Sequence, residues 1–181
     1  MLTHNTLGKN GRLGNQMFQY AATKGIALNG EHDYQIPSAG HSLFECFELP
    51  GIENHINPMQ GLQTFNERFF YFDEDFFNEQ VDDRDLFGYF QTEKYFKHIE
   101  KEIRKDFTFK DEIVEDCENI IKDIFDDPIA LHIRRGDFLI NSGNHYNQSL
   151  EYYENALSEF DFDRQVVIFS DDPKWCMSQD L

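Results

Sequence analysis

Residues 128–138 read PIALHIRRGDF, an apolar run that ends in two adjacent arginines and a glycine. Within it, residues 129–133 have the length and composition of a buried strand. Residues 149–157 (SLEYYENAL) predict a helix capped by Ser149, and residues 166–169 (VVIF) predict a second buried strand. Strand, helix and strand in this order form a βαβ unit, which predicts a parallel sheet covered on both faces.

Polar residues follow both predicted strands at the point where each strand ends. Residues 134–137 (RRGD) follow the first strand, and residues 170–172 (SDD) follow the second. In parallel α/β sheets, ligands bind beyond the carboxyl ends of the strands. Two guanidiniums there can grip a phosphate or diphosphate bidentately, and Gly136 lets the backbone come close to the ligand. The short carboxylates suit hydroxyls or the edge donors of a purine, so the pattern favours a nucleotide whose phosphates meet arginine.

Each of these features also has a purely structural interpretation. Arg134 and Arg135 can form ordinary ion pairs on the surface of so acidic a protein. Asp172 can simply be the N-cap of a helix that has Pro173 in its first turn. His132 alternates with the apolar residues of its strand, as a core histidine would. Because all of these signals converge on one sheet edge, the functional interpretation is favoured.

The first half of the sequence opens with a glycine-rich loop and a helical pattern over residues 8–30. Asn15 is expected to cap this helix, which should end near Gly30. The loop, with Arg12 and Gln16, suits sugar hydroxyls or a phosphate at the helix start, or it is a plain capped turn. The patterns for the other elements of this half are less clear. We expect a poor strand over residues 1–7, strands over residues 33–37 and 85–91, and a helix capped by Thr92. A further helix is expected over residues 111–125, with one apolar side formed by Ile113, Val114, Cys117, Ile120, Ile121 and Ile124.

The segment NERFFYFDEDFFNE, residues 66–79, is dense in phenylalanine among carboxylates and fits neither the helix nor the strand period. We interpret the phenylalanines over residues 65–77 as core, with an aromatic sugar platform as the alternative. The acidic triplets 73–75 and 161–163 are interpreted as surface.

Composition excludes several classes of function. The 181 residues suffice for one domain, or for one domain and part of another. A formal net charge of −18 argues against nucleic-acid binding and against an anionic membrane surface as a strong partner. Cys46, Cys117 and Cys176 lie far apart without CxxC spacing, which favours reduced thiols over disulfides or a zinc site. No apolar run approaches the ~20 residues of a membrane span, and no signal peptide is visible.

Five segments occur in one order and together resemble glycosyltransferase family 11, the α-1,2-fucosyltransferases. They are GRLGNQMFQYA (11–21), GYFQTEKYF (88–96), HIRRGDF (132–138), His145 followed by SLEYYENAL (149–157), and FSDDPKWC (169–176). The resemblance implies an α/β, GT-B-like fold of two Rossmann-like domains. We expect an acceptor-side α/β domain over residues 1–125 and the start of the GDP-fucose-binding domain over residues 126–181. The family pattern continues further, so the second domain is expected to be incomplete and the protein truncated at its carboxyl end.

The resemblance also implies an activity, the inverting transfer of L-fucose from GDP-β-L-fucose to the 2-hydroxyl of a galactose in a glycan, with no metal required. Arg134 and Arg135 match the arginines that neutralise the diphosphate leaving group, and this is where charge develops in the transition state. The resemblance also implies that His132 and Asp172 contact guanine, with Asp171 close to them, and it assigns Ser170 to the donor site without a separate role. The GRLGNQ loop, which includes Gly14, is expected to line the cleft, with Asn15 and Gln16 near the sugar and Arg12 as a phosphate partner.

A transfer of this kind needs at most one general base. Asp137 is the first candidate and His145 the second, and a loosely assisted dissociative mechanism is the alternative to both. Two other functions stay open: a non-catalytic nucleotide- or glycan-binding remnant, and a metal-dependent phosphohydrolase using Asp137, Asp171 and Asp172, which the arginine pair disfavours. We expect an enzyme of bacterial or viral style in the cytoplasm, or attached peripherally to the inner membrane.

Overall fold

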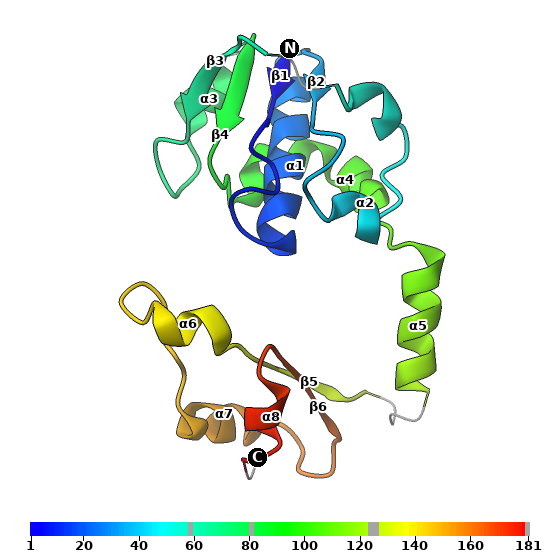
Figure 1. Ribbon diagram of the computed structural model, residues 1–181, viewed down its shortest axis with the longest axis vertical. Coiled ribbons are helices and arrows are strands. Elements are labelled where there is room, and N and C mark those ends of the chain that lie inside the picture. Colours follow the sequence, from blue (N-terminus) through cyan, green and yellow to red (C-terminus); the bar gives the residue numbers. More distant parts are fainter. Residues whose placement is uncertain (58–59, 80–81, 123–126, 180–181) are drawn as a thin grey trace. The chain divides into compact units, whose positions relative to one another are not determined.

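A computed structural model describes residues 1–57, 60–79, 82–122 and 127–179 of the protein (Figure 1). The polypeptide divides into two compact units, Met1–Glu115 and Asp116–Leu181, and each contains its own sheet. The domain boundary expected at residues 125 and 126 lies outside the described residues.

The first unit contains a parallel sheet of four short strands in the order β2-β1-β4-β3. Their bounds are β1 (Leu2–Thr3), β2 (Tyr34–Gln35), β3 (Gln63–Asn66) and β4 (Arg84–Phe87). The weak strand expected at the start of the sequence is an internal strand of this sheet, since Leu2 pairs with both Tyr34 and Arg84. Full burial of Leu2 and Thr3 explains why two residues suffice there.

The long helix α1 (Leu13–Asn29) packs deeply into the first unit and ends at Gly30 as predicted. The expected cap at Asn15 is wrong, because the helix starts at Leu13 and Arg12 is its N-cap residue. Thr92 caps a short 3-10 turn rather than a regular helix. The other helical elements of the unit are α2 (Leu43–Cys46), η1 (Ile52–His55), α3 (Glu74–Asn78), η2 (Glu93–Tyr95), η3 (Lys97–Ile99) and α4 (Glu100–Asp106).

The phenylalanine-rich segment divides between core and surface. Phe76 is 1% exposed and stacks on Phe65 with ring centroids 3.7 Å apart. Phe70, by contrast, is 91% exposed. The interpretation of Asp73 as surface is wrong, because this residue is 5% exposed, caps α3 and forms an ion pair with Arg68.

The second unit is built on the predicted βαβ unit. The division between the two units falls within helix α5 (Asp111–Ile121). The elements that follow it are β5 (Ile129–Ile133), α6 (Gly136–Ile140), α7 (Leu150–Leu157), β6 (Val166–Ser170) and α8 (Pro173–Cys176). Strands β5 and β6 pair in parallel, and Ser149 caps α7 as predicted. Of the residues expected to extend α5, 123–125 lie outside the described part of the protein.

One face of the β5–β6 sheet is covered. Ile129, Leu131 and Ile133 are buried, whereas Ala130 and His132 between them are exposed. Tyr153 of α7 and Cys176 of α8 pack with the buried residues. The expectation of cover on both faces is therefore not met within the described residues, and the core interpretation of His132 is wrong.

Candidate active site

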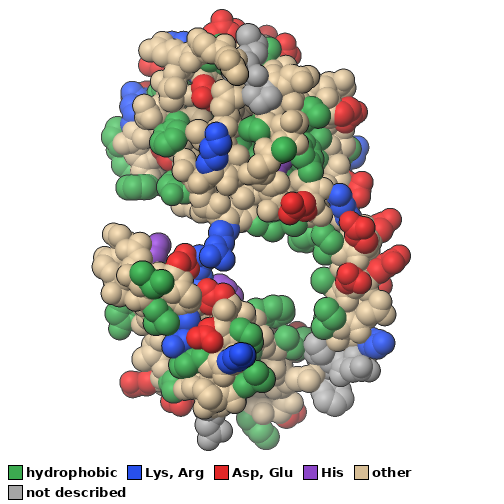
Figure 2. All heavy atoms as spheres, in the orientation of Figure 1, with side chains coloured by type: hydrophobic (Ala, Val, Ile, Leu, Met, Phe, Trp, Pro, Cys, Tyr) green, Lys and Arg blue, Asp and Glu red, His purple; other side chains and the backbone are tan. Residues whose placement is uncertain are grey.

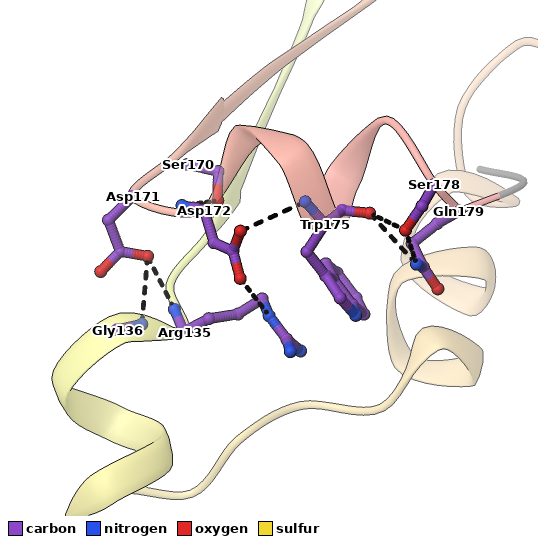
Figure 3. A network of polar contacts seen from close by, with 8 residues as sticks. All are labelled: Arg135, Gly136, Ser170, Asp171, Asp172, Trp175, Ser178 and Gln179. Atoms are coloured by element: carbon purple, nitrogen blue, oxygen red, sulfur yellow. Dashed lines mark hydrogen bonds and ion pairs between the residues drawn. The ribbon is translucent and has the colours of Figure 1, made fainter.

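The arginine pair and the two aspartates lie side by side at one edge of the second unit. Ile133, the last residue of β5, pairs in register with Ser170, the last residue of β6. The parallel pairing therefore brings residues 134–137 next to residues 170–172, as the sequence predicts. Figure 3 shows the contacts that join the two strand ends.

The side chain of Arg135 is held from two directions (Figure 3). Its Nε donates to Oδ2 of Asp172 at 3.2 Å, and its guanidinium carbon lies 3.7 Å from the centre of the Trp175 ring. The other oxygen of Asp172 accepts from the backbone N–H of Trp175 at 3.2 Å and caps α8. A planar guanidinium that is stacked and hydrogen-bonded at Nε has a defined direction for its terminal nitrogens.

Asp171 binds the backbone that follows β5. Its Oδ1 accepts from the N–H of Arg135 at 2.9 Å and from the N–H of Gly136 at 3.4 Å. The hydrogen bond from Arg135 is the main cause that holds the pKa of Asp171 below its usual range. A Cβ at Gly136 would lie 2.7 Å from the Asp171 carboxylate, so glycine permits this close approach.

Arg134 is engaged with the start of α6. Its Nε and Nη2 donate to the two carboxylate oxygens of Asp137 at 3.1 and 2.8 Å, and this hydrogen bonding raises the pKa of the guanidinium. The guanidinium carbon lies 4.8 Å from the centre of the Phe138 ring, and His145 stacks on the same ring at 4.2 Å. Both candidates for the general base, Asp137 and His145, are thus gathered around Arg134 and Phe138.

The structural interpretations of the arginines and of Asp172 are confirmed in the second unit, and the functional one stays a prediction. The ion pairs and the helix cap are present, yet the side chains of Arg134 and Arg135 remain 32% and 23% exposed. Nothing in the sequence pattern singles out Trp175 and Phe138 as partners of these arginines. Only the spacing of Trp175, three residues after the cap Asp172, hints at its place.

The GRLGNQ loop belongs to the first unit, where its polar side chains have separate partners. Asn15 accepts a hydrogen bond from Gln91, which joins two of the motif segments. Oε1 of the buried Gln16 accepts from the backbone N–H of Ser42 at 2.8 Å. Arg12 and Gly14 are exposed. The roles predicted for these four residues at a donor site stay predictions.

The described residues contain neither a metal-binding cluster nor a membrane-spanning helix. Within residues 1–57, 60–79, 82–122 and 127–179, no group of three or more His, Cys, Asp or Glu side chains is arranged to hold a metal ion. In the same part of the protein, no helix has the length and apolar character to cross a membrane. The three cysteines are free thiols, as predicted.

Sequence comparison relates the protein to one family of glycosyltransferases. The sequence model of glycosyl transferase family 11 matches residues 2–179. Galactoside alpha-(1,2)-fucosyltransferase 1 of Rattus norvegicus is 26% identical over 195 residues, covering 95% of this chain and 50% of the rat protein. The Homo sapiens protein of the same name is 30% identical over 153 residues, covering 74% of this chain and 40% of the human protein. The chain spans about half the length of the curated relatives it matches.

Comparison with solved structures supports the predicted fold. The crystal structure of NodZ alpha-1,6-fucosyltransferase soaked with GDP-fucose matches with a TM-score of 0.54 at 11% sequence identity. The match covers 96% of this chain and 71% of that chain. At this identity the likeness concerns the fold alone, and it confirms the predicted α/β, GT-B-like class.

Proposed function

This chain belongs to glycosyl transferase family 11, and from this premise we propose that the protein is a galactoside α-1,2-fucosyltransferase. The donor is GDP-β-L-fucose and the acceptor is the 2-hydroxyl of a galactose in a glycan. The bond between the anomeric carbon of fucose and the β-phosphate oxygen breaks, and a bond from that carbon to the galactose oxygen forms with inversion. GDP leaves, and the acceptor hydroxyl gives up its proton. The names of the rat and human relatives support this assignment.

The observation that carries the proposal is the fixed guanidinium of Arg135 beside Arg134. An oxocarbenium-like transition state builds negative charge on the departing diphosphate, and cations already in place stabilise that charge without reorganisation. Asp172 and Trp175 hold Arg135 by its Nε and its flat face. Within the described part of the protein, Nε is the hydrogen-bonded nitrogen of this side chain, so the two terminal nitrogens can bind phosphate oxygens in a bidentate manner.

Arginine in this position supplies the charge that a divalent cation would otherwise bring to the leaving group. We propose that the transfer proceeds without added metal for that reason. We also propose that guanine is contacted from the ends of β5 and β6, by His132 and Asp172 with Asp171 close to them, and that Ser170 belongs to the same donor site. The exposed imidazole of His132 supports this, since it lies on the uncovered face of β5 two residues before Arg134.

The general base is proposed to be Asp137 or His145. Both oxygens of Asp137 accept hydrogen bonds from Arg134, so this carboxylate already has a partner in the folded protein. The imidazole of His145 stacks on the Phe138 ring that the Arg134 guanidinium also contacts. The pH dependence of the transfer rate separates the two, because only the true base, when replaced as Asp137→Asn or His145→Gln, abolishes the acid limb of the profile.

The test is calorimetric titration of the protein with GDP and with UDP, in the presence of EDTA, followed by an assay of fucose transfer from GDP-fucose to lactose. We expect micromolar binding that is selective for GDP, and transfer that survives EDTA. A folded protein that binds neither nucleotide contradicts the proposal. GDP binding without transfer to lactose would favour the alternative function, a nucleotide-binding protein that does not catalyse the reaction.

A further inference from the structure

The turn between β3 and α3 carries three adjacent aromatic side chains that are exposed. Phe69 is 42%, Phe70 91% and Tyr71 65% exposed. Hydrophobic side chains gather over the end of β3 and the turn that follows it in Figure 2. We call Phe69, Phe70 and Tyr71 the aromatic platform. Leaving a large apolar side chain in water forgoes about 1.5–3 kcal/mol of burial free energy, so a cluster of them points to a binding role.

The platform stands on a turn that is fixed at both ends. On one side, the carboxylate of Glu67 accepts from the backbone N–H groups of Tyr89 and Phe90 at 2.7 and 3.0 Å. On the other side, Arg68 donates to both oxygens of Asp73 at 2.6 and 2.7 Å, and Asp73 is itself buried. A surface held in this way loses little conformational entropy on binding.

Two of the three rings of the platform stack on each other. Phe69 and Tyr71 stack with ring centroids 4.8 Å apart and planes 8° from parallel. The guanidinium carbon of Arg68 lies 5.8 Å from the centre of the Phe69 ring. Because Tyr71 is 65% exposed, the stacked pair still offers ring surface and a hydroxyl to a ligand.

The place of the platform in the fold is one where ligands bind. It follows the carboxyl end of β3, which pairs in parallel with β4, and Tyr89 follows β4 at the same edge. Residues after β4 also bond to α1, since Gly88 accepts from Gln19 and Gln91 donates to Asn15. The platform, the end of β4 and the start of α1 therefore form one contiguous edge of the first unit.

We propose that the aromatic platform binds a neutral pyranose ring, namely the galactose of the glycan acceptor; this choice of sugar rests on the proposed function. One face of galactose presents C–H bonds rather than hydroxyls and packs on an aromatic ring. The net charge of −18 repels anionic lipids and nucleic acids but not a neutral sugar. A stable protein interface uses about 20–30 residues a side, whereas a platform of three side chains matches the size of a sugar.

The experiment is a titration of the 181-residue chain with lactose, monitored by saturation-transfer NMR. It compares the wild type with Phe70→Ala, with Tyr71→Ala and with the two substitutions combined. The matched control is Phe162→Ala, a fully exposed phenylalanine of the second unit. Because the exposed Phe70 packs on little else, its replacement should leave the fold intact, which the thermal midpoint checks. We expect the combined platform variant to bind lactose at least tenfold more weakly and the control to bind it as the wild type does.

Parallel GDP titrations separate this inference from the proposed function. Platform variants should keep wild-type GDP affinity. Lactose binding that depends on the platform, in a protein that binds no GDP, supports the platform and contradicts the transferase proposal. Equal lactose affinity in the wild type and the platform variant overturns the inference, and so does a wild type that binds GDP but not lactose. Self-association that depends on Phe70 and occurs in place of sugar binding would identify the platform as a protein contact and also overturn it.

Discussion

The Oδ2 atom of Asp172 lies 3.2 Å from Nε of Arg135, and this ion pair ties the end of β6 to the end of β5. The same carboxylate caps α8 through its other oxygen. The side chain of Asp172 thus both caps helix α8 and orients the guanidinium of Arg135, which is 37 residues away in the sequence. The cap is a property of the local sequence, and the ion pair is a property of the fold.

Replacing Asp172 separates these two roles. Asparagine is as good an N-cap as aspartate, so Asp172→Asn should leave the thermal midpoint nearly unchanged. The same variant loses the charge that orients Arg135, and we expect GDP affinity to fall about tenfold, the equivalent of one charge-assisted hydrogen bond of about 1.5 kcal/mol. Asp172→Ala should lose both stability and affinity. Unchanged GDP binding by Asp172→Asn would contradict the role given to this contact.

The arginines themselves allow a conservative test. Arg135→Lys keeps the positive charge but loses the planar fork and the stacking on Trp175, so GDP affinity should fall about 10- to 100-fold. Arg104→Lys is the matched control, because Arg104 is 76% exposed and forms an ordinary ion pair with Glu100 in the first unit. Calorimetric titration with GDP measures both. Equal losses of GDP affinity in the two variants would contradict the proposed role of Arg135 in the donor site.

How far the sequence predicts the structure depends on the range of the interactions involved. Ser149 and Asp172 can be recognised as caps because capping acts within one helical turn. The sequence around Leu2 predicts only a poor strand, because this strand is stabilised by pairing with Tyr34 and Arg84, which are distant in the sequence. The stacking of Arg135 on Trp175 cannot be predicted for the same reason, since the two residues are distant in the sequence.

The phenylalanine-rich segment illustrates a second limit. Phe70 and Phe76 have the same side chain and similar neighbours, yet one is 91% and the other 1% exposed. Hydrophobicity alone favours burial for both, so the sequence predicts core throughout. Glu67, three residues before Phe70, is hydrogen-bonded to the segment after β4, and contacts of this kind between distant parts of the polypeptide are not visible in the sequence.

The buried His4 predicts a pH dependence of the stability of the first unit. Burial lowers the pKa of His4 from 6.5 to about 4, with Asp85 opposing the shift. In the unfolded state the imidazole takes up a proton below pH ~6.5, whereas in the folded state it stays neutral until about pH 4. The stability contributed by neutral His4 is therefore complete above pH ~6.5 and is lost as the pH falls toward the folded value, by about 3 kcal/mol in all.

The measurement is urea unfolding at pH 7 and pH 5 for the wild type and for His4→Asn. Asparagine can retain a hydrogen bond to Thr23, which lies 3.3 Å from Nδ1 of His4, but it does not titrate. The wild type should lose more stability between the two pH values than the variant does. Equal losses would show that other groups set the acid sensitivity.

A pair of glycines in α1 provides a test of packing with an internal control. A Cβ at Gly25 would lie 2.2 Å from the carbonyl oxygen of Tyr95, so Gly25→Ala should force α1 away from the segment after β4 and destabilise the first unit by about 1–3 kcal/mol. A Cβ at Gly14 would meet no atom within 4 Å, and Gly14→Ala should be neutral or stabilising by up to about 1 kcal/mol because alanine favours the helix. Thermal unfolding of the two variants compares them directly. Helix propensity favours alanine at both positions. Opposite changes in stability for the two variants would therefore identify the close approach of α1 to Tyr95 as the cause. An unchanged stability of Gly25→Ala would contradict that contact.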